Sequence, residues 1–102
     1  MKDRILGLLG LANRGGNLVF GESIFYSLPK NKVHLVILAT DASANTTKKV
    51  MDKTSYYLAS VASFATKAEL GHALGKGDIA VVGIMDANLA IKVKTLLKDG
   101  DI

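Results

Sequence analysis

Hydrophobic residues occur at two different spacings along the chain, and these spacings predict alternating helices and strands. Near the N-terminus they recur every three or four residues and so share one face of a helix, formed by Ile5, Leu8, Leu9 and Ala12. Elsewhere they are consecutive, and the runs at 34–40 and 79–85 are rich in β-branched side chains, as is typical of strands covered on both faces. Four strands are predicted in all, at 17–20, 34–40, 60–64 and 79–85.

Residues that favour helix ends divide the remaining segments into helices. Glycine in the final turn and proline just after it both end helices, and such signals are present at Gly15-Gly16, Pro29 and Gly75. Side chains that accept hydrogen bonds from the first turn mark helix starts, and the expected caps are Ser43, Thr66 with its capping-box partner Glu69, and Asp86. The order of elements is therefore αβαβαβαβα, which predicts an α/β fold with one sheet between helical layers.

Each predicted strand is followed at once by a helix, at 21–22, 41–43, 65–66 and 85–86. If the strands are largely parallel, these four junctions lie along one edge of the sheet, where open α/β sheets bind their ligands. Helix N-termini at that edge would offer free backbone N–H groups and partial positive charge, which suit phosphate. Every α/β domain has such an edge, so it is a place for a site and does not identify one.

Composition and charge narrow the function only slightly. Of the 102 residues, 49% are hydrophobic and 22% are charged, which is typical of one globular domain, and only residues 99–102 lack a pattern and are expected to be loose. The net charge of +4 lies entirely in residues 1–51 and permits nucleic acid as a partner without establishing it. No apolar run approaches the length of about 20 residues that spans a membrane, and we expect a cytoplasmic protein.

The residues that would support catalysis or metal binding are missing. The absence of cysteine excludes a disulfide, a thiolate metal site and a cysteine nucleophile. His34 and His72 have no second ligand at metal-binding spacing. The glycine patterns of dinucleotide-binding sites and of serine hydrolases are absent as well. We therefore expect no catalytic residue, no metal and no cofactor, and a protein that is not an enzyme.

Three stretches of the chain resemble the signature segments of a known family. They are 17–22 (NLVFGE), 31–43 (NKVHLVILATDAS) and, most specific, 66–75 (TKAELGHALG). In order and spacing they resemble the L-seven-Ae/L-thirty-e ribosomal protein family, and especially its bacterial YlxQ-type branch. The resemblance covers nearly the whole chain. It implies a three-layer α/β/α sandwich with a four-stranded mixed sheet, and a single RNA-binding-type domain over residues 1–102.

Members of this family characteristically bind kink-turn RNA, a sharply bent duplex with tandem sheared G·A pairs. The resemblance therefore implies a non-catalytic, ribosome-associated RNA-binding protein whose partner is a structured RNA, either a kink-turn or ribosomal RNA. We expect neither DNA nor a membrane as a partner, and we expect a monomer. Shape would provide much of the specificity, as is usual for proteins that recognise RNA.

The resemblance also implies which residues contact the RNA. Their expected roles form four groups: close approach of the backbone (Gly21), reading of base edges (Glu22, Ser23, Asp41), contact with phosphate (Lys30, Lys32, Lys67), and cover for an unstacked base (Ile84 and Met85, with Asp86 in the same loop).

The chain departs from the first contact motif of the family, G-x-N-E-x-x-K, at Ser23, Ile24 and Ser27. Serine cannot make the bidentate contact of asparagine, isoleucine cannot accept a hydrogen bond, and Ser27 removes a phosphate contact. These changes leave an alternative open, a protein–protein interaction module that keeps the fold but has lost the kink-turn contacts. An exposed Ile24 beside Phe25 would form an apolar patch and favour that alternative, whereas a buried Ile24 would not.

Overall fold

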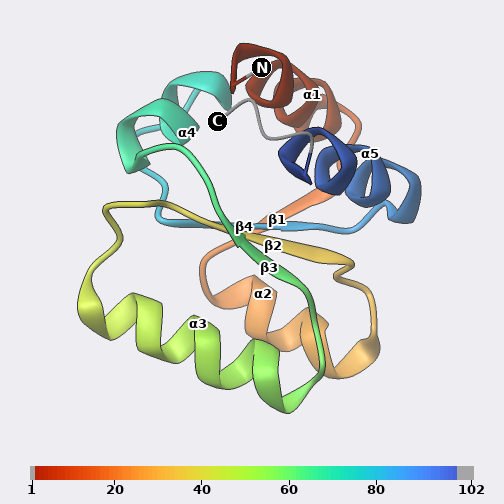
Figure 1. Cartoon of the computed structure of the whole chain (residues 1–102), viewed down its shortest axis with the longest axis vertical. Coiled ribbons are helices and arrows are strands. Elements are labelled where there is room, and N and C mark those ends of the chain that lie inside the picture. Colours follow the sequence, from red (N-terminus) through yellow and green to blue (C-terminus); the bar gives the residue numbers. More distant parts are fainter. Residues whose placement is uncertain (1, 99–102) are drawn as a thin grey trace.

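The structure, a computed structural model, describes residues 2–98, so the expectations for residues 99–102 and for the outer limits of the domain fall outside the described part. Its elements follow the predicted order (Figure 1). They are α1 (Lys2–Arg14), β1 (Leu18–Phe20), α2 (Glu22–Ser27), the 3-10 turn η1 (Leu28–Lys30), β2 (Leu35–Leu38), α3 (Ala44–Tyr56), β3 (Val61–Ser63), α4 (Lys67–Ala73), β4 (Val81–Ile84) and α5 (Ala87–Lys98).

The four strands form one mixed sheet in the order β1-β4-β2-β3. The strand β4 is antiparallel to both of its neighbours, whereas β2 and β3 are parallel. Because β1 and β2 both oppose β4, they run in the same direction as each other and as β3. The fold class predicted from the sequence, an α/β sandwich with a mixed sheet, is confirmed.

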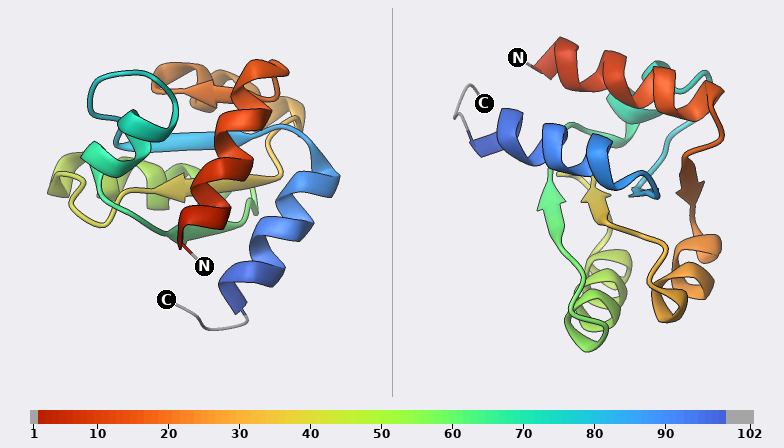
Figure 2. Two further views of the ribbon diagram at one scale, coloured as in Figure 1. Left: turned by 90° about the horizontal axis from the view of Figure 1, so that it is seen from above. Right: turned by 90° about the vertical axis from the view of Figure 1, so that its right-hand side faces the viewer.

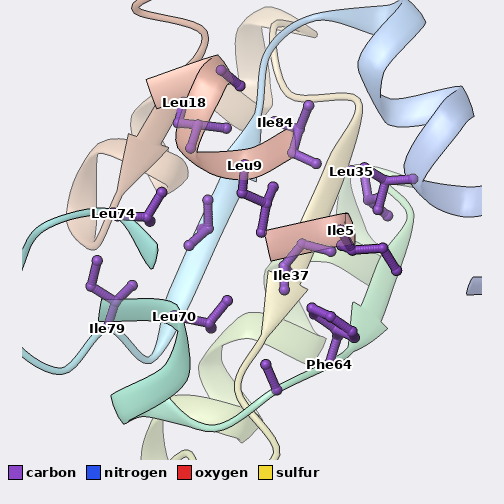
Figure 3. Close-up of a cluster of buried hydrophobic side chains, with 14 of the residues drawn as sticks. Ile5, Leu9, Leu18, Leu35, Ile37, Phe64, Leu70, Leu74, Ile79 and Ile84 are labelled. Carbon is purple, nitrogen blue, oxygen red and sulfur yellow. The ribbon is translucent and has the colours of Figure 1, made fainter. Parts of the chain in front are cut away.

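Helices cover both faces of the sheet (Figure 1, Figure 2). The helices α1, α4 and α5 lie on one face, and α2 and α3 lie on the other. Each face has its own hydrophobic core, and the larger core lies beneath α1, where Ile5, Leu9 and Ile37 are fully buried (Figure 3). The second core lies between the sheet and the pair α2 and α3, around Ile24 and Val36. Within residues 2–98, no helix is both long enough and apolar enough to cross a membrane.

The direction of β4 corrects one expectation about the site. Three junctions between a strand and the following helix, at 21–22, 41–43 and 65–66, lie at the edge where β1, β2 and β3 end, which we call the carboxyl edge. The fourth junction, Met85-Asp86, lies at the opposite edge. The backbone shows this directly, because Met85 donates to the carbonyl of Asn17, just before β1, and His34, just before β2, donates to the carbonyl of Ile84.

The predicted helix caps are present. Ser43 accepts a hydrogen bond of 3.1 Å from the first turn of α3. Thr66 and Glu69 form the complete capping box of α4, with reciprocal bonds of 3.1 Å and 2.9 Å. Asp86 accepts a bond of 2.9 Å from the start of α5. At each of these three helices a side-chain oxygen therefore already binds at least one of the N–H groups that were expected to be free for phosphate.

Candidate functional site

A hollow of about 360 Å³ opens at the carboxyl edge, beside the end of β1. Three segments that are distant in the sequence form its walls: the β1–α2 junction, the first half of α3, and the connection from α4 to β4. They meet there because β1 pairs with β4, so the end of one strand lies beside the start of the other. The lining residues are Phe20, Gly21, Glu22, Phe25, Thr46, Lys49, Asp78, Ile79, Ala80 and Val81.

An exposed ion pair crosses this hollow. The Nζ of Lys49, on α3, lies 2.8 Å from Oε1 and 3.1 Å from Oε2 of Glu22, the first residue of α2. The same ammonium lies 4.6 Å from the centre of the Phe25 ring. Both charged side chains remain accessible to solvent, so the pair contributes at most about 1 kcal/mol to stability. The pair therefore orients a carboxylate and an ammonium at the surface, and both remain available to contact a ligand.

A second lysine stands on the α4–β4 wall. The Nζ of Lys76 lies 5.3 Å from the centre of the Phe20 ring. The backbone of this connection is held at both ends, because Lys76 donates to the carbonyl of Gly71 at 2.8 Å and Ile79 donates to the carbonyl of Lys67 at 3.1 Å. Its path runs so close to α4 that a Cβ on Gly71 would clash with the backbone of the connection.

The start of α2 is the helix N-terminus that has no side-chain cap at this edge. Gly21 occupies the capping position with φ +55° and ψ −133°, a conformation that is strained for other residues, and it has no side chain that could accept a hydrogen bond. The N–H groups of the first turn of α2 are therefore not capped by a side chain. Gly21 and Glu22, the capping residue and the first residue of this helix, both line the hollow.

Five of the residues expected to contact RNA lie at the carboxyl edge, namely Gly21, Glu22, Ser23, Asp41 and Lys67. The first two line the hollow, and Ser23 is exposed next to them. Asp41 and Lys67 lie farther along the edge, where Oδ1 of Asp41 accepts a hydrogen bond of 2.8 Å from the backbone N–H of Lys67. Although Asp41 directly precedes α3, whose cap is Ser43, its carboxylate binds the start of α4.

The other five do not join them. Lys30 and Lys32 lie before β2, and Met85 and Asp86 follow β4, so all four are at the opposite edge. Ile84 is fully buried in the larger core and has no surface with which to cover a base. The expectation that positions 21–23, 32, 41 and 84–86 converge on one surface is therefore wrong. Lys32 precedes a strand that ends at the carboxyl edge, so it lies at the other end of β2. Met85 and Asp86 lie there because β4 runs in the reversed direction, and Ile84 is excluded by its burial.

The position of Ile24 bears on the protein–protein alternative. Its side chain is 1% exposed and packs in the core between the sheet and α2. The neighbouring Phe25 is partly buried and lines the hollow, while Tyr26 is exposed. The apolar surface patch that would have favoured a protein-docking module at this helix is therefore not formed by Ile24.

Three parts of this site were not predicted from the sequence: Lys49, Lys76 and the start of β4. Lys49 was one of several exposed lysines on an amphipathic helix, and Lys76 followed a glycine in a loop. No local pattern distinguishes such lysines from ordinary solvated ones. The only available signal was the pairing of β1 with β4, which would have brought the loop before β4 next to Gly21.

The hollow combines three kinds of contact. The carboxylates of Glu22 and Asp78 can accept hydrogen bonds from amino groups, Lys49 in the lining and Lys76 next to it attract anions, and the two phenylalanine rings provide apolar surface. A ligand that carries phosphates and flat rings with amino groups matches all three.

Comparison with known proteins agrees with the fold and places the chain in a family. The model of the ribosomal protein L7Ae/L30e/S12e/Gadd45 family matches residues 3–94. A protein of Bacillus subtilis (strain 168) named RNA-binding protein YlxQ is 42% identical over 91 residues, which is 88% of this chain and 91% of that protein. The protein of the same name from Enterococcus faecium is 39% identical over 98 residues, or 95% and 94% of the two chains.

A solved structure has the same fold. It is a protein of unknown function from Bacillus halodurans C, with a TM-score of 0.87 and 37% identity, and the match covers 92% of this chain and 96% of that one. The family model spans most of the chain, and relatives with about 40% identity match it nearly end to end. The chain belongs to the ribosomal protein L7Ae/L30e/S12e/Gadd45 family.

Proposed function

We propose that this protein binds structured RNA at the hollow on the carboxyl edge, that a kink-turn is the preferred RNA, and that it acts without catalysis. The observation that carries the proposal is the placement of the Glu22 carboxylate at the uncapped start of α2, with Lys49 in the lining of the hollow and Lys76 beside it, over the ring of Phe20. The names of its relatives, RNA-binding proteins in a ribosomal protein family, support the same conclusion.

Each contact has a role that follows from its chemistry. The backbone approaches the RNA closely at Gly21, and the carboxylate of Glu22 accepts from an exposed amino group of a base. Ser23 adds one hydroxyl beside it. Lys49 and Lys76 neutralise phosphates of the bent backbone, and this contribution does not depend on base sequence. Asp41 and Lys67 extend the surface toward β3 for an RNA that follows the edge.

The surface is complete within one chain, so one copy suffices for binding, in line with the monomer expected from the sequence. Lys30, Lys32, Met85 and Asp86 would contact only an RNA that continues around the molecule to the opposite edge. We propose a cytoplasmic, ribosome-associated location, which the family description supports. Burial of Ile24 removes the apolar patch that would have favoured the protein–protein alternative, while the departures from the contact motif at Ser23 and Ser27 remain.

A titration compares a kink-turn RNA with the same duplex lacking its G·A pairs, at two salt concentrations. Specific binding should persist at the salt concentration that removes non-specific binding, because base and shape contacts do not release counterions. Equal affinity for the two duplexes at both concentrations would refute the preference for a kink-turn. No binding to either duplex, or to ribosomal RNA fragments, would refute RNA binding.

Two variants test whether the RNA binds at the hollow. Glu22→Gln keeps the size of the side chain but weakens its acceptor, so the preference for the kink-turn over the control duplex should fall, by about tenfold if one good base contact is lost. Asp52→Asn is the matched control, because it removes one exposed carboxylate from α3 away from the hollow. The assignment fails if both variants change the preference equally.

A further inference from the structure

A groove of about 550 Å³, larger than the hollow, is lined by residues of α1 and α4. These two helices lie on the face of the sheet opposite α2 and α3 (Figure 2). The apolar lining of the groove comes from Leu6, Gly7, Gly10, Leu11, Ala68 and Ala73, and its polar lining comes from Asp3, Arg14, Glu69 and His72. Leu11 projects beside it with 62% of its surface exposed. The groove is thus an apolar helix face with charged residues around it, and no segment of residues 2–98 covers it.

The wall formed by α1 has charges of opposite sign at its two ends. Asp3 and Arg14 lie on the same face of the helix, eleven residues apart, which corresponds to about 16 Å along the axis. They are too far apart to pair with each other. Glu69, on the α4 wall, already has Lys2 as its partner at 3.0 Å. Among residues 2–98 neither Asp3 nor Arg14 forms an ion pair, so within this part of the chain the two ends of α1 present a negative and a positive charge along an apolar surface.

The groove-facing residues of α1 match those of a second α1 helix that runs in the opposite direction. An antiparallel copy of α1, related by a two-fold axis between positions 8 and 9, would bring three pairs of residues together: Asp3 with Arg14, Leu6 with Leu11, and Gly7 with Gly10. The two ionic pairs close the ends, the leucines pack between them, and Gly7 lets the helices approach, whereas Gly10 already lies close to the carbonyl of Ala73 on α4 of its own chain. Symmetry repeats each pair, which is the pattern of an isologous dimer interface.

We propose that a second copy of this chain occupies the groove, with the two α1 helices antiparallel and each seated between α1 and α4 of its partner. Gly7 supports this assignment. Glycine inside a helix lowers stability relative to alanine, and a Cβ at Gly7 would meet no atom of its own chain within 4 Å. Packing within one chain therefore does not require this glycine, whereas close approach of a second helix does.

The occupant is specified by charge. A foreign partner would need to carry an acidic and a basic residue at the same separation and in the reversed order, and this chain carries both itself. The proposed dimer replaces the monomer expected from the sequence, and it does not rest on RNA binding, for which one copy has a complete hollow. It leaves the hollow open in both copies, because α2 and α3 lie on the opposite face of the sheet (Figure 1).

The first test measures the mass of the full chain in solution by sedimentation equilibrium, from micromolar to millimolar concentration. The proposal expects a reversible monomer–dimer equilibrium. Leu11→Asp should shift it to monomer, whereas Ile91→Asp, on α5 with a similar exposure of 60%, should leave it unchanged. A wild-type chain that stays monomeric at every concentration, or equal effects of the two variants, would overturn the proposal.

Charge reversal tests the antiparallel register. Asp3→Arg alone and Arg14→Asp alone each replace two attractive pairs by two repulsive ones, so each homodimer should weaken by about tenfold or more. When the two variant proteins are mixed, every ionic pair is attractive again, and a heterodimer should form about as tightly as the wild-type dimer. Circular dichroism of each variant checks that it is folded. If the mixture of folded variants does not recover association, the antiparallel register is wrong.

Discussion

The carboxylate of Asp41, at the end of β2, accepts a hydrogen bond of 2.8 Å from the backbone N–H of Lys67, the first residue of α4. The two residues are joined across neighbouring parallel strands, because β2 pairs with β3 and β3 leads into α4. Thr40, next to Asp41, strengthens the same junction by donating twice to the carbonyl of Ala65, at 2.8 Å from its backbone and 3.2 Å from its hydroxyl. This junction fixes the start of α4, and α4 in turn holds the connection that forms one wall of the hollow.

Replacing Asp41 should therefore change stability. Asp41→Ala leaves the N–H of Lys67 without its acceptor, and loss of a capping acceptor costs about 1 kcal/mol. For a chain of this size that corresponds to a fall in Tm of about 4–8 °C. Thermal unfolding followed by circular dichroism measures it, with Asp52→Ala as the control at an exposed position of α3.

The same variant distinguishes two roles for Asp41. If the residue reads a base edge, as the family resemblance implies, Asp41→Ala also reduces discrimination between a kink-turn and its control duplex. If its role is only to cap α4, discrimination measured well below the melting temperature stays at the wild-type level. An unchanged Tm would contradict the structural role seen here.

The distribution of lysines predicts which positive charges meet the RNA. Lys49→Gln and Lys76→Gln remove cations from the walls of the hollow, so each should weaken binding to kink-turn and control duplex alike and reduce the salt slope by about one. Lys32→Gln, at the opposite edge, should leave binding of a short kink-turn within about twofold, on the same reasoning. Fluorescence anisotropy over a series of salt concentrations measures all three. A larger loss for Lys32→Gln than for Lys49→Gln would place the RNA at the other edge.

The elements of this fold were predictable because each is encoded locally. The spacing of Ile5 and Leu9 identifies α1, and the T-x-x-E box identifies the start of α4 in the sequence as it does in the structure. Burial is encoded almost as directly, since the two apolar runs became the two strands whose residues are all buried. In these cases the property and its signal belong to the same few residues.

The site was only partly predictable because it depends on strand direction. An apolar run such as 79–85 predicts a strand equally well in either direction, so the sequence alone did not place Met85-Asp86 at the edge opposite Gly21. For the same reason, Lys76 could not be recognised as a neighbour of Phe20. For Gly21 the family resemblance implied a close approach of the backbone. The positive φ seen in the structure suits glycine and depends on that residue alone, not on the direction of a strand.

The close approach of α4 to the following connection makes Gly71 a sensitive position. A Cβ there would clash with the carbonyl carbon and oxygen of Gly77. Because these are backbone atoms and not the end of a flexible side chain, the connection itself must move. We expect Gly71→Ala to destabilise the fold by about 1–3 kcal/mol and to weaken RNA binding through displacement of the wall that carries Lys76.

Gly7→Ala is the matched control for Gly71→Ala. It places the same methyl group in open space on the exposed face of α1 and should stabilise the chain by about 0.5–1 kcal/mol. Urea unfolding at a dilution that keeps the chain monomeric compares the two free energies of unfolding. Equal changes of the same sign would show that helix propensity, and not the clash, determines the effect at position 71.

The capping box of α4 should make stability depend on pH in the acidic range. The backbone N–H of Thr66 and the ammonium of Lys2 both bind the ionised carboxylate of Glu69, and they lower its pKa from the ordinary value of 4.5. A lowered pKa in the folded state means that the stabilisation is complete above 4.5 and is lost as the pH falls through the folded value.

Glu69→Gln keeps a capping acceptor but has no charge to lose. The difference in unfolding free energy between wild type and this variant, measured by urea titration, should therefore be constant near neutral pH and shrink as the pH falls below 4.5. A difference that stays the same down to the lowest pH at which both proteins fold would show that the charge of Glu69 contributes nothing.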